Sequence, residues 1–225
     1  MVRKNKAKSE DDIGTINGTL LGLLALMLAF SFGMANSRYD TRRQLVIEEA
    51  NVIGTVILRT DIYPDSMRNL LRILLKDYVK ARIGFYNVGD NFALMYSEQS
   101  RSGVISGEIW KAVADYAKID DVTTRTSVLI PALNDMIDIT TTRLAASESS
   151  IPDSILYFLF TLCFCSAFLL GYDQKNKFDW TVLTGFSIML SVTVFTIIDL
   201  DRPRSGLINM DKPNKKIENL MEMFD

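Results

Sequence analysis

Three long uncharged runs stand out in the pattern of apolar and polar positions along this chain. They are Ile16–Ala35, Ile155–Tyr172 and Trp180–Ile198, and none of them contains Asp, Glu, Lys or Arg. As α-helices they would extend for roughly 27–30 Å, which is the thickness of the hydrocarbon core of a bilayer. The pattern therefore predicts three transmembrane helices, and the short polar link over residues 173–179 makes the last two a hairpin.

The polar positions divide the rest of the chain. Residues 1–14 form a polar tail that we expect to be disordered. The helical register of the first run continues without a Gly-Pro break to Pro64, so we predict one helix over residues 15–63 that leaves the membrane and continues outside it. The other segments are an extramembrane helical region over residues 64–150, the hairpin over residues 151–199 and a polar C-terminal tail over residues 200–225.

Within the extramembrane region, the apolar spacing predicts three further helices. Pro64 and Asp65 should form a turn and an N-cap, residues 83–91 should form a loop, and Pro131 should kink or divide the last helix. No segment alternates apolar and polar residues as a strand would. The predicted fold class is therefore all-α, an integral membrane protein with three transmembrane helices and a helical extramembrane bundle. The predicted extramembrane helices cover residues 65–82, residues 97 or 103 to 117, and residues 122–146.

One face of the first span carries only small residues. Gly18, Gly22, Ala25, Ala29 and Gly33 recur there at helical spacing. Such a face lets the backbone of another helix approach closely. The approaching helix belongs either to the C-terminal hairpin of the same chain or to another subunit, and the spacing does not distinguish the two.

A polar stripe follows on the extramembrane part of the first helix, with apolar residues over most of the remaining circumference. One interpretation is a solvated face of a bundle helix, and the other is the lining of a vestibule or pore. A third is that Glu48 and Glu49 form weak ion pairs with Arg42 and Arg43. The stripe comprises Ser37, Thr41, Gln44, Glu48, Asn51, Thr55 and Arg59, of which the last five are the candidates for a pore lining.

Two further polar groups lie near the ends of the spans. Asp199 comes directly after the last run, and Pro203 should stop that helix, so Asp199 lies in the last turn, where a negative charge is unfavourable. We expect Asp199 to pair with Arg202 or Arg204 in a structural role. The first group, a membrane-boundary cluster, comprises Asp199, Asp201, Arg202 and Arg204, and the second comprises Asp135, Asp138 and Thr142, which should serve polar packing.

Composition excludes several classes of function. The chain carries 25 Lys and Arg against 27 Asp and Glu, a net charge of −2 that does not suit a nucleic-acid-binding protein. It has no His, and Cys163 and Cys165 lie within a span, so we expect them to pack as apolar residues rather than to bind a metal. The sequence contains no nucleophile motif and no phosphate-binding loop. We therefore predict neither an enzyme nor a cofactor.

Six segments of the chain, taken in order, carry a resemblance to a known family. They are GLLALMLAFSF, SRYDTRRQLVIEEANVIGTVILR, ALNDMIDITTTRLAA, IPDSILYFLF, LLGY and DLDRPRSGLI. In these segments the sequence resembles the bestrophin-like integral membrane family of bacteria, from Leu20 to about Ile208. The resemblance implies an all-helical protein with paired spans, similar to the bestrophins, which are pentameric anion channels with a cytoplasmic helical domain. Members of that family commonly carry a further span before the one at Ile16.

The function that we predict is an oligomeric, bestrophin-like channel or channel-related protein for small ions, with anions implied by the resemblance. The alternative is a non-conducting scaffold or regulator whose helical region docks a partner. A chain of three spans has too few helices to enclose a water-filled path, so a channel needs several copies, five by resemblance.

We expect the protein to lie in the inner membrane of a bacterium. The basic residues that flank the spans favour a cytoplasmic extramembrane region, although the basic residues of the N-terminal tail favour the opposite orientation.

Overall fold

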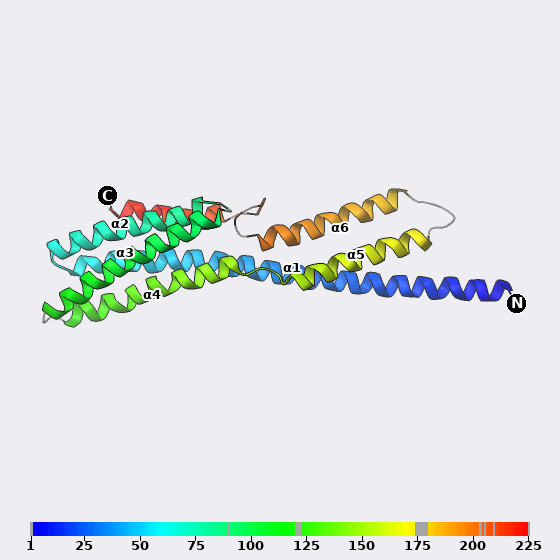
Figure 1. The fold of residues 1–225 in the computed structure, drawn as a ribbon, viewed down its shortest axis with the longest axis horizontal. Helices are drawn as coiled ribbons and strands as arrows, with labels where there is room; N and C mark the ends of the chain where they lie inside the picture. The colour runs from blue at the N-terminus through cyan, green and yellow to red at the C-terminus, as the bar shows by residue number, and fades with distance from the viewer. Residues whose placement is uncertain are drawn as a thin grey trace. The chain divides into compact units, whose positions relative to one another are not determined.

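A computed structural model describes residues 2–89, 91–119, 123–173, 180–202, 204, 206–208 and 210–224. Every regular element within these ranges is a helix, which confirms the predicted all-α fold class (Figure 1). Three helices are long and apolar enough to cross a membrane, and each of them overlaps one of the three predicted spans.

Helix α1, Val2–Arg59, is unbroken over 58 residues. This confirms that the first span continues as a polar-striped helix beyond the uncharged run. The helix begins earlier than Thr15 because the preceding polar segment lacks Pro and has no Gly before Gly14, and it is rich in residues that favour helices. It ends in a 3₁₀ turn, Thr60–Ile62, after which the extended Tyr63 leads to Pro64.

The other helices differ from the predicted ones mainly at their ends. The predicted loop over residues 83–91 is mostly helical, since α2 continues to Asn87. Pro64 is the N-cap of α2, whereas Asp65 is its first helical residue, and α4 runs through Pro131 without being divided. The bounds are α2 Asp65–Asn87, α3 Phe92–Ile119, α4 Thr123–Glu148, α5 Asp153–Asp173, α6 Trp180–Asp201 and α7 Asp211–Glu218, followed by a 3₁₀ helix, Asn219–Phe224.

The chain divides into two compact units. The first, the membrane unit, comprises Met1–Tyr39 and Ser150–Arg202, and the second, the helical unit, comprises Asp40–Ser149 and Pro203–Asp225. Helix α1 contributes residues to both units.

The membrane unit has a small core and an apolar surface. Leu24 of α1 packs with Leu159 and Leu162 of α5, and Leu190 and Val194 of α6 lie against them. Many of its other large apolar side chains are exposed, including those of Phe164 and Met189. An exposed apolar surface of this kind suits lipid rather than water.

The helical unit is built around a conventional apolar core. The second half of α1 packs together with α2, α3 and α4, and α7 packs on α2 (Figure 1). Tyr78 is fully buried there and donates a hydrogen bond to the Met136 carbonyl at 3.3 Å. Ile217 and Leu220 also reach this core, so much of the predicted polar tail over residues 200–225 is an amphipathic part of the fold.

Candidate functional site

The small-residue face of α1 is open within the chain. Gly18, Gly22, Ala25, Ala29 and Gly33 are all exposed. A Cβ atom added at any of the three glycines would meet nothing within 4 Å among the described residues. The hairpin instead packs on the side of α1 that carries Leu24, so intrachain packing does not account for the small residues.

The polar stripe lies on the outer surface of the helical unit. Gln44, Glu48 and Asn51 are exposed, and Thr55 and Arg59 are partly exposed. The Thr55 hydroxyl donates to the Asn51 carbonyl at 2.9 Å, and Arg59 Nη1 donates to the Val128 carbonyl at 2.6 Å. The stripe therefore presents amide, hydroxyl and charged groups to the surroundings, all of which suit contact with water and ions.

A hollow of about 380 Å³ connects the stripe to a second group of polar residues. It brings Glu48 of α1 together with Asp135, Asp138 and Thr142 of α4. Glu48, Asp135 and Asp138 are all exposed. The two polar groups that the sequence analysis treated separately thus form one acidic surface.

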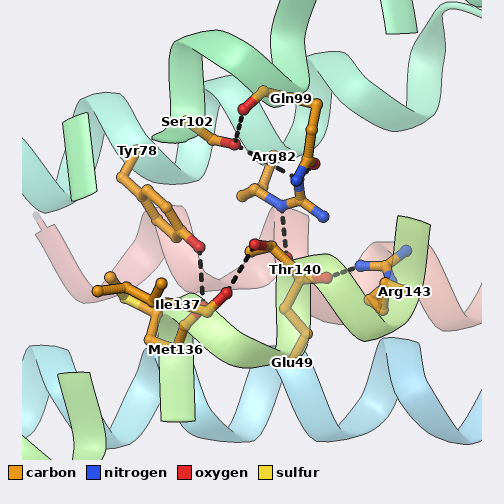
Figure 2. Close-up of polar contacts among 9 residues, drawn as sticks. All are labelled: Glu49, Tyr78, Arg82, Gln99, Ser102, Met136, Ile137, Thr140 and Arg143. Atoms are coloured by element: carbon orange, nitrogen blue, oxygen red, sulfur yellow. Dashed lines mark hydrogen bonds and ion pairs between the residues drawn. The ribbon is translucent and has the colours of Figure 1, made fainter. Parts of the chain in front are cut away.

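The neighbouring carboxylate, Glu49, has the opposite environment, which sequence reasoning missed. Its side chain is 0% exposed, and its Oε1 accepts a hydrogen bond from Nε of the equally buried Arg82 at 2.5 Å. Nη1 of Arg143 forms an ion pair with Oε2 (Figure 2). The ion pairs of Glu49 with Arg82 and Arg143 replace the predicted weak pairing with Arg42 and Arg43.

Further contacts hold the buried Arg82 side chain in place. Nη1 of Arg82 donates to Oε1 of Gln99 at 2.6 Å and to Oγ of Ser102 at 3.5 Å (Figure 2). The Arg82 guanidinium lies 4.5 Å from the centre of the Phe85 ring, a favourable cation–π distance. These contacts join α1, α2, α3 and α4 through one buried polar network.

Burial dominates the electrostatics of this network. Burial raises the pKa of Glu49, whereas the charge of Arg82 and its hydrogen bond lower that pKa. Burial also raises the pKa of Tyr78 well above its ordinary value. A buried charge is tolerated only when it is paired, so Glu49 and its two arginines depend on one another.

The membrane-boundary cluster is divided between the two units. In the membrane unit, Asp201 accepts the Ile151 N–H with both carboxylate oxygens, at 2.9 and 3.1 Å. Asp199 is buried, and its carbonyl accepts the Arg202 N–H at 3.3 Å. In the helical unit, Arg204 donates to the Phe85 carbonyl at 2.7 Å. The structural role expected for Asp199, paired with Arg202 or Arg204, stays a prediction.

No group of three or more His, Cys, Asp or Glu residues in the described part of the chain is placed to hold a metal ion. Cys163 and Cys165 are both free thiols.

A family model described as a bestrophin-like domain matches residues 2–212. The crystal structure of a bacterial bestrophin homolog from Klebsiella pneumoniae has a TM-score of 0.73 and covers 93% of this chain and 87% of that one, at 13% identity. A single-substitution variant of that homolog gives a TM-score of 0.72 at 14% identity, with the same coverage. At this identity the likeness establishes a shared fold, and no curated protein sequence matches the chain.

Proposed function

Because the chain belongs to the bestrophin-like family of membrane proteins, we propose that it forms an oligomeric channel for small ions and catalyses no chemical step. The observation that carries the proposal is the continuity of α1 from an uncharged span into a helix with an exposed polar stripe. A helix of this kind can present polar groups to water at the exit of a transmembrane path.

Several copies of the chain are needed to build such a path. Three spans cannot surround a water-filled pore, and the open small-residue face from Gly18 to Gly33 suits close packing of a helix from a neighbouring copy. Symmetric rings are the usual solution for identical subunits. By resemblance to bestrophins we propose five copies around one axis.

We propose that the polar stripe borders the ion path. Glu48 of the stripe forms the acidic surface together with Asp135 and Asp138. Grouped carboxylates concentrate cations and repel anions. A path along this surface should therefore favour cations, contrary to the anion preference that the family resemblance implies.

A flux measurement tests the proposal. We expect the protein reconstituted in liposomes to pass small monovalent ions, and Glu48→Gln to lower the cation-to-anion permeability ratio, measured as a reversal potential in a salt gradient. Glu108→Gln is the matched control, since Glu108 is an exposed carboxylate on α3 outside the stripe.

Two results would contradict this reading. A protein that conducts no ion at any salt concentration or voltage fits the alternative, a scaffold whose helical unit docks a partner. If Glu48→Gln and Glu108→Gln change the cation-to-anion permeability ratio equally, the polar stripe does not border the ion path.

The proposal also includes a membrane location and an orientation for the protein. We propose that the protein lies in a bacterial inner membrane with the helical unit in the cytoplasm. The basic residues of that unit near the spans, such as Arg42, Arg43 and Arg143, support this orientation.

A further inference from the structure

The helical unit contains a pocket of about 80 Å³ that lies outside the polar stripe and the acidic surface. A volume of this size holds several water molecules or one small polyatomic ion. Three arginines and one carboxylate lie in its wall, together with neutral polar side chains. The charged lining residues are Arg42, Arg143, Arg204 and Asp211, and the neutral polar ones include Tyr86, Ser147 and Asn214.

Two of the arginines are held in the wall by the ends of helices. Arg42 donates from Nε to the Ala146 carbonyl at 3.0 Å and from Nη2 to the Ser149 carbonyl at 2.5 Å, at the C-terminal end of α4. Arg204 donates to the Phe85 carbonyl near the C-terminal end of α2. Helix C-termini carry partial negative charge, so they favour guanidinium groups at these positions. The pocket is therefore preorganised with positive charge.

The third arginine, Arg143, adds a buried charge. It is 6% exposed, stacks 4.2 Å from the centre of the Tyr86 ring and shares the Glu49 carboxylate with Arg82. Burial lowers the pKa of Arg143, and the charge of Arg204 lowers it further. The two guanidiniums therefore repel each other in an environment of low polarity.

The charges around the pocket do not balance. Arg42, Arg82, Arg143 and Arg204 form the lining and the network attached to it, whereas Glu49 and Asp211 are the carboxylates of that set. Among the described residues of this lining and network there are thus four guanidiniums and two carboxylates. An anion with two negative charges would balance this set and relieve the repulsion between Arg143 and Arg204.

Two neutral groups give an independent indication of a ligand. Oδ1 of Asn214 and the hydroxyl of Tyr86 are buried, and neither has a hydrogen-bond partner among the described residues. A buried polar atom without a partner is costly, and buried sites normally satisfy such atoms. Both residues line the pocket. The Tyr86 hydroxyl can donate to an oxyanion bound there, and Oδ1 of Asn214 can accept from a protonated oxygen of that ion, such as the P–OH of hydrogen phosphate.

We propose that this pocket binds a small divalent oxyanion of the phosphate class, held by Arg42, Arg143 and Arg204. Guanidinium groups match the geometry of phosphoryl oxygens and form charge-assisted hydrogen bonds with them. The small volume suits a single phosphoryl group, either free or at the end of a larger molecule that extends out of the pocket.

The test uses the full-length protein in detergent at constant ionic strength, with inorganic phosphate as the probe and chloride as the control ion. We expect phosphate, but not chloride, to raise the unfolding temperature in a saturable way. Arg204→Gln and Arg42→Gln should each weaken phosphate binding by about tenfold or more. Arg59→Gln is the matched control and should leave the affinity unchanged, since Arg59 contacts the Val128 carbonyl outside the pocket.

A second variant makes the test independent of any loss of folding. Asp211→Asn removes the carboxylate from the pocket lining and should strengthen phosphate binding severalfold. A parallel titration with AMP identifies the source of the phosphoryl group. Tighter binding of phosphate than of AMP indicates the free ion, and tighter binding of AMP indicates a phosphoryl group on a larger ligand.

Three outcomes would overturn the proposal. The first is that neither probe has a saturable effect on the unfolding temperature of the wild-type protein. The second is that Arg59→Gln and Arg204→Gln lose phosphate affinity equally. The third is that Asp211→Asn binds phosphate more weakly. The titration does not measure ion flux, so the phosphate-binding proposal stands even if the channel proposal fails.

Discussion

The Glu49 carboxylate lies between two arginine side chains in the interior of the helical unit, where neither water nor salt screens the charges. Glu49, Arg82 and Arg143 connect α1, α2 and α4. Gln99 and Ser102 extend this network to α3. Replacing a buried pair by apolar groups is often harmless, but removing a single partner leaves an uncompensated charge. At the scale of single residues, this dependence makes Glu49 a structural residue of the unit.

We expect Glu49→Gln to lower the free energy of unfolding by about 3–5 kcal/mol, because it leaves Arg82 and Arg143 buried without a carboxylate. Denaturation of the purified protein, followed by circular dichroism, measures this loss. Glu48→Gln is the control, and this exposed neighbour should change the stability by less than about 0.5 kcal/mol. Similar losses for both variants would show that the buried network contributes little.

Asp201 has an analogous role in the membrane unit. Its carboxylate accepts the N–H of Ile151, which is 1% exposed, two residues before α5 begins. Asp201→Ala should therefore cost about 1–3 kcal/mol, the penalty for a buried donor without a partner. Asp201→Asn keeps an acceptor oxygen and should cost less, as measured by thermal unfolding in detergent. If both variants lose the same stability, the charge of Asp201 matters rather than its hydrogen bonds.

At the scale of elements, α1 has four different surfaces along one continuous helix. Its side with Leu24 packs on the hairpin, its small-residue face is open, and its later turns bury Ile53 and Ile57 in the core of the helical unit. The polar stripe occupies the outer side of those later turns. A single helix thus contributes residues to both units and also carries the surface that we assign to contacts between subunits.

Gly22→Leu tests the small-residue face. The added side chain meets no described atom of the same chain, so the fold of the isolated subunit should persist. We expect it to reduce the fraction of oligomer, measured by light scattering in detergent, because it separates helices that need close approach. Leu23→Phe, at an exposed position about 100° around the same helix from Gly22, serves as the control. An unchanged oligomer would indicate that this face contacts lipid.

At the scale of the whole molecule, the two units have different kinds of stability. The membrane unit has a small core and an exposed apolar surface, whereas the helical unit has a large apolar core with a buried ionic network. Several large apolar side chains of the helical unit are nevertheless exposed, among them Leu58, Ile73 and Val104. Such side chains suit further contacts between copies in a channel, or contacts with a partner in a scaffold.

The mass of the purified particle distinguishes these two possibilities. We expect a ring of several copies, five by resemblance, when native mass spectrometry is applied to the protein in detergent. A strict monomer would rule out the channel, because one chain cannot enclose a path. A ring would leave the flux measurement to decide whether the path conducts.

The amino-acid sequence alone determined the fold class, the three spans and the continuity of α1. These are local properties, since the length of an uncharged run and the spacing of apolar residues need no partner from elsewhere in the chain. Helix ends were less predictable, as with α2, where the glycines and Asn87 indicated a loop but packing continues the helix. The segment after residue 200 was predicted to be a polar tail, because its apolar residues are few. Only the structure shows that Ile217 and Leu220 are buried in the core of the helical unit.

The tertiary structure decided the roles of the polar residues. Glu48 and Glu49 are adjacent and chemically identical, yet one faces the surroundings and the other is fully buried, because α2 and α4 supply arginines on one side of α1 only. The pocket of Arg42, Arg143 and Arg204 likewise gathers residues from three distant parts of the chain. Sequence periodicity assigns a residue to a helix face, but only packing determines what that face meets, and electrostatics then follows from distance and burial.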